Sequence, residues 1–122
     1  MFIPIQKLIS RTFLLLAVLL ATTHVGVSAD LKKALSAYNE GDFSAAFAQW
    51  KPLAEQGNAS AQFYLGNLYH SGKGIPADQK IAVQWYQKAA QQGHTDAQVN
   101  LGNAYAYGKG VQSDSVRAVK WY

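Results

Sequence analysis

Apolar and small side chains recur at intervals of three and four residues in two successive segments of the chain, residues 61–71 and 82–89. This spacing places them on one face of an α-helix in each segment. They are Ala61, Leu65, Leu68 and Tyr69 in the first segment and Ala82, Trp85, Tyr86 and Ala89 in the second. The connecting stretch GKGIPAD (residues 72–78) has glycines suited to a helix end and Asp78 suited to the next helix start. The pattern predicts an antiparallel helix hairpin.

The hairpin pattern returns 36 residues later. Of the 26 pairs that align residues 61–86 with residues 97–122, 14 are identical. Self-similarity at this period is typical of a stacked array of repeats. Asn58 and His94 are the expected first residues of these two hairpins, and Asp114 is the equivalent of Asp78.

A shorter copy lies upstream, where residues 42–57 align with residues 78–93 at the same offset of 36. Its first helix, residues 31–40, is followed by a turn that lacks five of the loop residues of the later units. We therefore expect an all-α solenoid of about three antiparallel hairpins, over residues 30–57, 58–93 and 94–122. Gly66 and Gly102 lie inside the first helices of the second and third hairpins. A glycine there costs about 1 kcal/mol relative to alanine, so we interpret both as points of close helix approach.

The pattern A-Q-x-x-L-G-x-x-Y-x-x-G-x-G-[IV]-x-x-D-x-x-x-A-x-x-W-Y is complete in residues 61–86 and again in residues 97–122. It resembles the Sel-one-like repeat, a relative of the tetratricopeptide repeat, and residues 30–57 look like an ordinary tetratricopeptide hairpin. The resemblance implies a right-handed α-solenoid that acts as a protein-interaction scaffold, often in exported bacterial proteins. One secreted branch of the family is stapled by disulfides and linked to penicillin binding and hydrolysis. This chain has no cysteine, so that activity is not carried over.

Residues 1–29 have the features of a secretory signal. Lys7 and Arg11 are its positive region, residues 12–21 its apolar core, and VSA at residues 27–29 a cleavage site before Asp30. The alternative is an uncleaved anchor, but the apolar run is shorter than the ~20 residues that span a bilayer. We expect cleavage, a periplasmic or secreted location and no stable membrane span afterwards.

Composition and side-chain spacing narrow the function classes further. Without the signal, nine basic and seven acidic residues remain, a net charge of +2, which is too mild to indicate a nucleic-acid partner. His70 and His94 occupy non-equivalent positions and have no second ligand at i+3 or i+4, so no metal site is expected. The serines are not part of any catalytic constellation, and Asp42 fits a helix cap better than an acid–base role. We expect no enzyme activity and no cofactor.

A candidate partner-binding surface follows from the helical wheel, because the first helices of such solenoids line the concave face. Its expected residues are Lys32, Ser36 and Asn39 in the first unit, Phe63, Asn67 and His70 in the second, and Val99, Asn103 and Tyr107 in the third. The alternative is that these are ordinary solvent-facing residues. We favour a protein or peptide partner held in this groove. A cell-envelope factor that binds glycan or cell-wall fragments, with Tyr64 and Tyr107 stacking on sugars, stays open.

The third unit stops at residues 121–122, although its counterpart in the second unit continues through residues 87–93. We expect this unit to be truncated, with the rest of the helix and further repeats belonging to a longer chain. The alternative is a genuine terminus covered by a partner or by a second copy.

Overall fold

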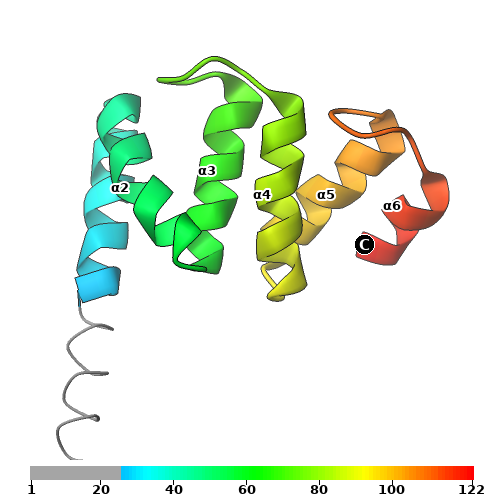
Figure 1. The fold of residues 1–122 in the computed structure, drawn as a ribbon, viewed down its shortest axis with the longest axis horizontal. Coiled ribbons are helices and arrows are strands. Elements are labelled where there is room, and N and C mark those ends of the chain that lie inside the picture. Colours follow the sequence, from blue (N-terminus) through cyan, green and yellow to red (C-terminus); the bar gives the residue numbers. More distant parts are fainter. Residues whose placement is uncertain (1–25) are drawn as a thin grey trace, which may run out of the picture.

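The computed structural model describes residues 26–122, and that part of the chain contains helices and no strand. Its helices span residues 26–39, Phe43–Glu55 (α2), Ala59–Ser71 (α3), Gln79–Gln91 (α4), Thr95–Tyr107 (α5) and Ser115–Trp121 (α6). They follow one another along one direction in chain order (Figure 1). Each helix packs mainly on its sequence neighbours, and α3 with α4 makes the most extensive pair. The fold is the helical repeat solenoid predicted from the sequence.

The predicted signal lies outside the described residues except at its end. Residues 26–39 form one helix, so the expected cleavage site between Ala29 and Asp30 falls inside it. Val27 packs against the core formed with α2 and α3. Within residues 26–122, no helix is both long and apolar enough to cross a membrane.

A side-chain cap begins each helix from α2 onward. Asp78 Oδ1 accepts the Ile81 amide over 3.1 Å, and Asp114 Oδ1 accepts the Arg117 amide over 3.0 Å. His94 caps α5 through Nδ1, which accepts the amide of Ala97 over 3.3 Å. These caps satisfy amides that have no intrahelical partner. The helix starts expected at Asn58, Asp78, His94 and Asp114 are confirmed.

Each glycine loop packs against the second helix of the preceding unit. Gly74 and Gly110 have φ of +73° and +74°. A Cβ atom at Gly74 would lie 2.9 Å from the carbonyl carbon of Phe43, at the start of α2. One at Gly110 would collide with the carbonyl of Gln79, the residue at the start of α4. Phe43 and Gln79 are 36 positions apart, as are the two glycines. The same contact therefore recurs every 36 residues, and it includes the first unit even though the turn of that unit is shorter.

The core consists of two apolar clusters along the array. One combines the helix of residues 26–39 with α2 and α3, and the other combines α4, α5 and α6. Trp50 is fully buried in the first, where its ring stacks on Tyr64 at a centroid distance of 4.6 Å. Trp85 and Trp121, which occupy equivalent positions in the second and third units, are only half-buried. Lys88 Nζ lies 4.6 Å from the ring centroid of Trp85. Trp85 therefore lies at the edge of the core.

Gly66 allows α3 and α4 to approach each other closely. A Cβ atom there would lie 2.6 Å from Cε1 of Tyr86 and 3.3 Å from the carbonyl oxygen of Ala82. Such a contact is far shorter than van der Waals distance, so only glycine fits without movement of α4. In the third unit a Cβ atom at Gly102 would lie 2.9 Å from Cε1 of Tyr122. The interpretation of Gly66 as a point of close helix approach is confirmed, whereas the nearest contacts at Gly102 are all with the ring of Tyr122, beyond the end of α6.

Candidate functional site

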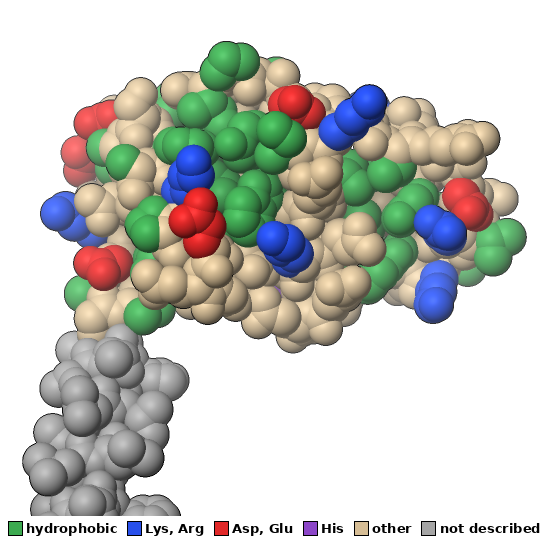
Figure 2. Space-filling view, viewed as in Figure 1, with side chains coloured by type: hydrophobic (Ala, Val, Ile, Leu, Met, Phe, Trp, Pro, Cys, Tyr) green, Lys and Arg blue, Asp and Glu red, His purple; other side chains and the backbone are tan. Residues whose placement is uncertain are grey.

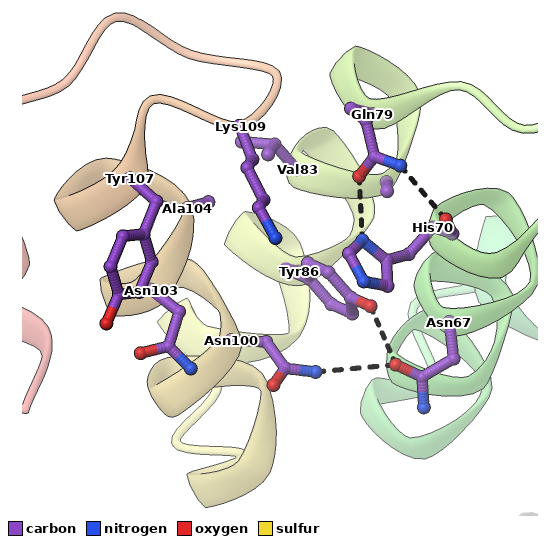
Figure 3. Close-up of a pocket in the computed structure, with 11 residues that line it drawn as sticks. Asn67, His70, Gln79, Val83, Tyr86, Asn100, Asn103, Ala104, Tyr107 and Lys109 are labelled. Carbon is purple, nitrogen blue, oxygen red and sulfur yellow. Dashed lines mark hydrogen bonds between the residues drawn. The ribbon is translucent and has the colours of Figure 1, made fainter.

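The structure has a groove of about 220 Å³ between α3 and α5, with α4 as its floor (Figure 3). Hydrogen-bonding side chains dominate its lining, and the apolar members come from α4 and α5. The lining residues are Asn67 and His70 of α3, Gln79, Ala82, Val83 and Tyr86 of α4, Asn100, Asn103, Ala104 and Tyr107 of α5, and Lys109 of the following loop.

Tyr86 connects the floor of the groove with its α3 wall. Its side chain is only 3% exposed, and its hydroxyl donates to Oδ1 of Asn67 over 2.7 Å. Burial raises the pKa of Tyr86 to about 12, and the nearby amide of Asn100 offsets a smaller part of that effect. The hydroxyl therefore keeps its proton throughout the physiological range and remains a donor.

Asparagine amides connect the two walls. Nδ2 of Asn100 donates to Oδ1 of Asn67 over 3.4 Å, so this oxygen accepts two hydrogen bonds, one of them from Tyr86 (Figure 3). The third unit repeats the tyrosine contact, since the Tyr122 hydroxyl donates to Oδ1 of Asn103 over 2.6 Å. In both units the amide oxygen is engaged by the second helix of its own hairpin.

His70 and Gln79 close the rim of the groove at the α3–α4 loop. Nδ1 of His70 donates to Oε1 of Gln79 over 2.7 Å, and Nε2 of Gln79 donates to the carbonyl oxygen of His70 over 2.9 Å. Because an amide oxygen can only accept, Nδ1 carries the hydrogen in this pair. The reciprocal bonds fix the imidazole against the first turn of α4, so it acts as part of the wall.

The charge of the groove comes from Lys109, whose ammonium group extends between the two walls (Figure 3). Aspartate and glutamate are missing from the lining residues. On the face shown in Figure 2, by contrast, positively and negatively charged side chains are interspersed. The groove thus combines amide and hydroxyl groups with one positive charge.

The structure brings four of the nine residues predicted for the partner surface into this groove. Asn67, His70, Asn103 and Tyr107 line it, and Tyr107 is 73% exposed at the rim. Val99 is exposed but lies outside the lining. The partner role of these residues stays a prediction.

The other predicted residues lie elsewhere. Phe63 is half-buried, with its ring stacked on His94 at a centroid distance of 4.6 Å. Lys32, Ser36 and Asn39 are exposed on the helix of residues 26–39, outside the groove, and Ser36 Oγ donates to Glu40 Oε1 over 2.9 Å. The groove is therefore a feature of the second and third units.

Five lining residues that contribute to the chemistry of the groove are not predicted from the sequence: Gln79, Val83, Tyr86, Asn100 and Lys109. The helical wheel considered first helices alone, whereas the floor comes from a second helix. Asn100 shares an i, i+3, i+7 face with Asn103 and Tyr107, and this spacing could have identified it. Lys109 lies in the loop after α5, where a helical wheel does not apply. Its equivalent Lys73 lies elsewhere, 5.1 Å from the ring centroid of Phe43.

Hydrogen bonding and charge pairing are the chemistry that this lining offers. No cluster of three potential metal ligands occurs in the part of the chain that the structure covers. Of the aromatic residues considered for sugar stacking, Tyr64 has one ring face covered by Trp50. Tyr107 alone of the two is well exposed. The arrangement suits recognition of a polar ligand in an extended form.

Comparison with known proteins agrees with the repeat pattern. The Sel1 repeat, the Sel-one-like repeat named above, matches residues 59–94 and 95–122. A protective antigen of uropathogenic Escherichia coli strains with this repeat fold is 37% identical, with a TM-score of 0.74 over 78% of this chain and 21% of that one. A Sel1 repeat protein from Oxalobacter formigenes is 38% identical, with a TM-score of 0.71 over 76% of this chain and 37% of that one.

Helicobacter pylori cysteine-rich protein B shares the fold at 22% identity and a TM-score of 0.62, over 79% of this chain and 83% of its own. The chain thus spans about a fifth and about a third of the length of the first two structures. Comparison with curated proteins gives no significant match.

Proposed function

The chain belongs to the Sel1 repeat family, whose members generally serve as protein-interaction scaffolds, and on that premise we propose that it is an exported scaffold. In this proposal the groove between α3 and α5 holds an extended segment of a protein partner. The observation that carries it is the lining itself, in which amide groups from two successive units face one continuous hollow. An extended peptide offers backbone hydrogen-bonding groups along its length, which such a surface can satisfy.

The size and shape of the groove support a peptide over a compact small molecule. Its volume of about 220 Å³ is below the ~300–1,000 Å³ typical of small-molecule pockets. The rim residues Tyr107 and Lys109 extend the contact surface beyond the hollow. Tyrosine is enriched at protein interfaces because its ring buries apolar area while its hydroxyl stays hydrogen-bonded.

Export is proposed on the N-terminal sequence, with Lys7 and Arg11 before the apolar residues 12–21 and VSA before Asp30. The site before Asp30 lies in the helix of residues 26–39, so cleavage would act on the chain before this helix folds. Expression in a bacterium followed by fractionation and N-terminal sequencing tests this. A chain that starts at Asp30 in the periplasm or medium is expected. A full-length chain in the cytoplasm would contradict export.

The scaffold function is tested by capture of partners on the immobilised chain, with two matched arginine substitutions. Asn103→Arg fills the groove from α5. Gln84→Arg adds the same charge on α4, at an exposed position outside the groove. We expect captured proteins to be lost with Asn103→Arg and retained with Gln84→Arg, while both variants melt like the parent. Equal capture by both variants would refute the groove as the partner site.

A further inference from the structure

The tyrosine–asparagine pair occurs in the second and third units and is replaced in the first. Tyr86 with Asn67 and Tyr122 with Asn103 have the same atoms in contact, at 2.7 and 2.6 Å. At the aligned positions the first unit has Trp50 and Ser36. The Nε1 atom of Trp50 is buried without a hydrogen-bond partner among the described residues, and Ser36 Oγ is bonded to Glu40. The first unit therefore offers no equivalent amide.

The pair fixes the orientation of each asparagine amide beside the groove. Because the tyrosine hydroxyl engages Oδ1, the Nδ2 group is turned away from the second helix. For Asn67, Figure 3 shows Nδ2 on the side opposite Tyr86. Within residues 26–122 no acceptor is paired with Nδ2 of Asn67 or Asn103. An amide nitrogen can only donate, so each asparagine keeps a donor group that is unpaired within the described residues.

The electrostatics of the groove favour the same class of ligand. Lys109 adds an ammonium group with three donors, and none of the lining residues carries a carboxylate. A cationic segment would meet Lys109 without any compensating negative group. A carboxylate can accept from the amides and pair with Lys109 at once, and hydrogen bonds to charged acceptors are the stronger ones.

We infer that this groove selects peptide segments that carry aspartate, glutamate or a terminal carboxylate, and that Tyr86 and Tyr122 act as positioning residues for the donor amides. This inference rests on the proposed scaffold function and specifies its ligand. The recognition is confined to the second and third units. Tyr86 contributes through Asn67, so loss of its hydroxyl allows that amide to turn and weakens the preference for an acceptor.

The test is selection of binders from a random peptide library with the purified full chain, followed by affinity measurement on the selected peptides. Each peptide is compared with its isostere in which Asn or Gln replaces Asp or Glu. We expect the selected set to be enriched in carboxylates and each isostere to bind about tenfold more weakly, as for loss of one charge-assisted contact. Affinity should also fall with added salt.

Matched variants assign the effect to the groove. Lys109→Gln and Asn103→Asp are expected to weaken binding about tenfold, whereas Lys73→Gln, at the equivalent loop position outside the groove, leaves it unchanged. Tyr86→Phe is expected to reduce the preference for carboxylate over isostere about threefold. A purely structural role would lower both affinities together and leave their ratio intact, which would refute the positioning role.

Two results would overturn the inference in distinguishable ways. If the selected peptides are apolar or basic and still lose affinity with Asn103→Asp, the groove binds peptides but the carboxylate preference is wrong. If no peptide is selected, or if every selected peptide is insensitive to the groove variants, the scaffold proposal fails together with the inference.

Discussion

The Cβ atom that any other residue would carry at position 66 lies 2.6 Å from Cε1 of Tyr86. Gly66 in α3 and Tyr86 in α4 thus pack backbone against ring, and the same tyrosine reaches past the glycine to bond Asn67. One contact sets both the approach of the two helices and the orientation of a groove amide. Stability and recognition are therefore coupled at this point of the repeat.

Replacement of Gly66 by alanine should destabilise the fold. Alanine gains about 1 kcal/mol in helix propensity, but its methyl group has to displace a ring that is only 3% exposed. Overpacking of this kind costs about 1–3 kcal/mol, so we expect a net loss in the free energy of unfolding. Gly102→Ala is the matched control, because it meets Tyr122, which is 66% exposed and can turn away. Urea unfolding of both variants checks this, and equal stabilisation by both would contradict it.

Equivalent valines on α4 and α6 should respond differently to truncation. Val83 is 5% exposed beneath α5, whereas Val119, 36 residues later, is 73% exposed. Burial of a valine side chain contributes about 1.5–3 kcal/mol. Val83→Ala is expected to lower the free energy of unfolding by about 1–3 kcal/mol, and Val119→Ala by less than about 0.5 kcal/mol. Thermal melts of the two variants give the comparison. A comparable loss in both would mean that the two positions have similar surroundings.

Alkaline pH should weaken the fold through Tyr86. Its pKa is raised from 10.0 to about 12 by burial, so the unfolded chain releases this proton before the folded chain does. The stabilisation is complete below about pH 10 and declines as the pH rises towards 12. At about pH 11 the loss should be about 1 kcal/mol relative to about pH 9. Tyr86→Phe removes this contribution, so the pH dependence of its unfolding should be shallower. Identical slopes for parent and variant would exclude Tyr86 as the source.

Alanine substitutions at Asn67 and Asn103 should differ in their effect on stability but both weaken binding. Asn67 accepts from the buried Tyr86 hydroxyl, so Asn67→Ala leaves that donor without its acceptor and should cost about 1–3 kcal/mol. Asn103 accepts from the exposed Tyr122, which water can satisfy, so Asn103→Ala should change stability by less than about 0.5 kcal/mol. Both should weaken capture of a partner. If Asn103→Ala binds its partner as the parent does, α5 is not part of the interface.

The hairpins, their caps and the close approach at Gly66 follow from the sequence because local signals recur at a fixed period. Asp78 and Asp114 cap helices through residues three positions away, and Gly66 stands out because glycine opposes helix formation. The 36-residue offset then places each element relative to its copy. Local rules and repetition are enough for the fold.

The groove depends on contacts between helices, which one helical wheel cannot predict. The spacing of Tyr86 predicts a core residue. Its hydroxyl reaches Asn67 because α3 and α4 approach each other closely at Gly66. Lys73 and Lys109 both lie within a G-K-G triplet yet have different surroundings. In the first unit Trp50 stands at the position of Tyr86. This unit therefore lacks the tyrosine–asparagine pair, although its second helix aligns with those of the later units.

Site-specific photo-crosslinking tests the central claim, the groove as partner surface, most directly. A photoreactive amino acid replaces Tyr107 at the rim of the groove or, as the control, Gln84 on α4 outside it. The chain is then irradiated in cells that express it. We predict a discrete crosslinked protein from position 107, lost when Asn103→Arg is added, and none from position 84. Crosslinks from position 84 with none from position 107 would contradict the account.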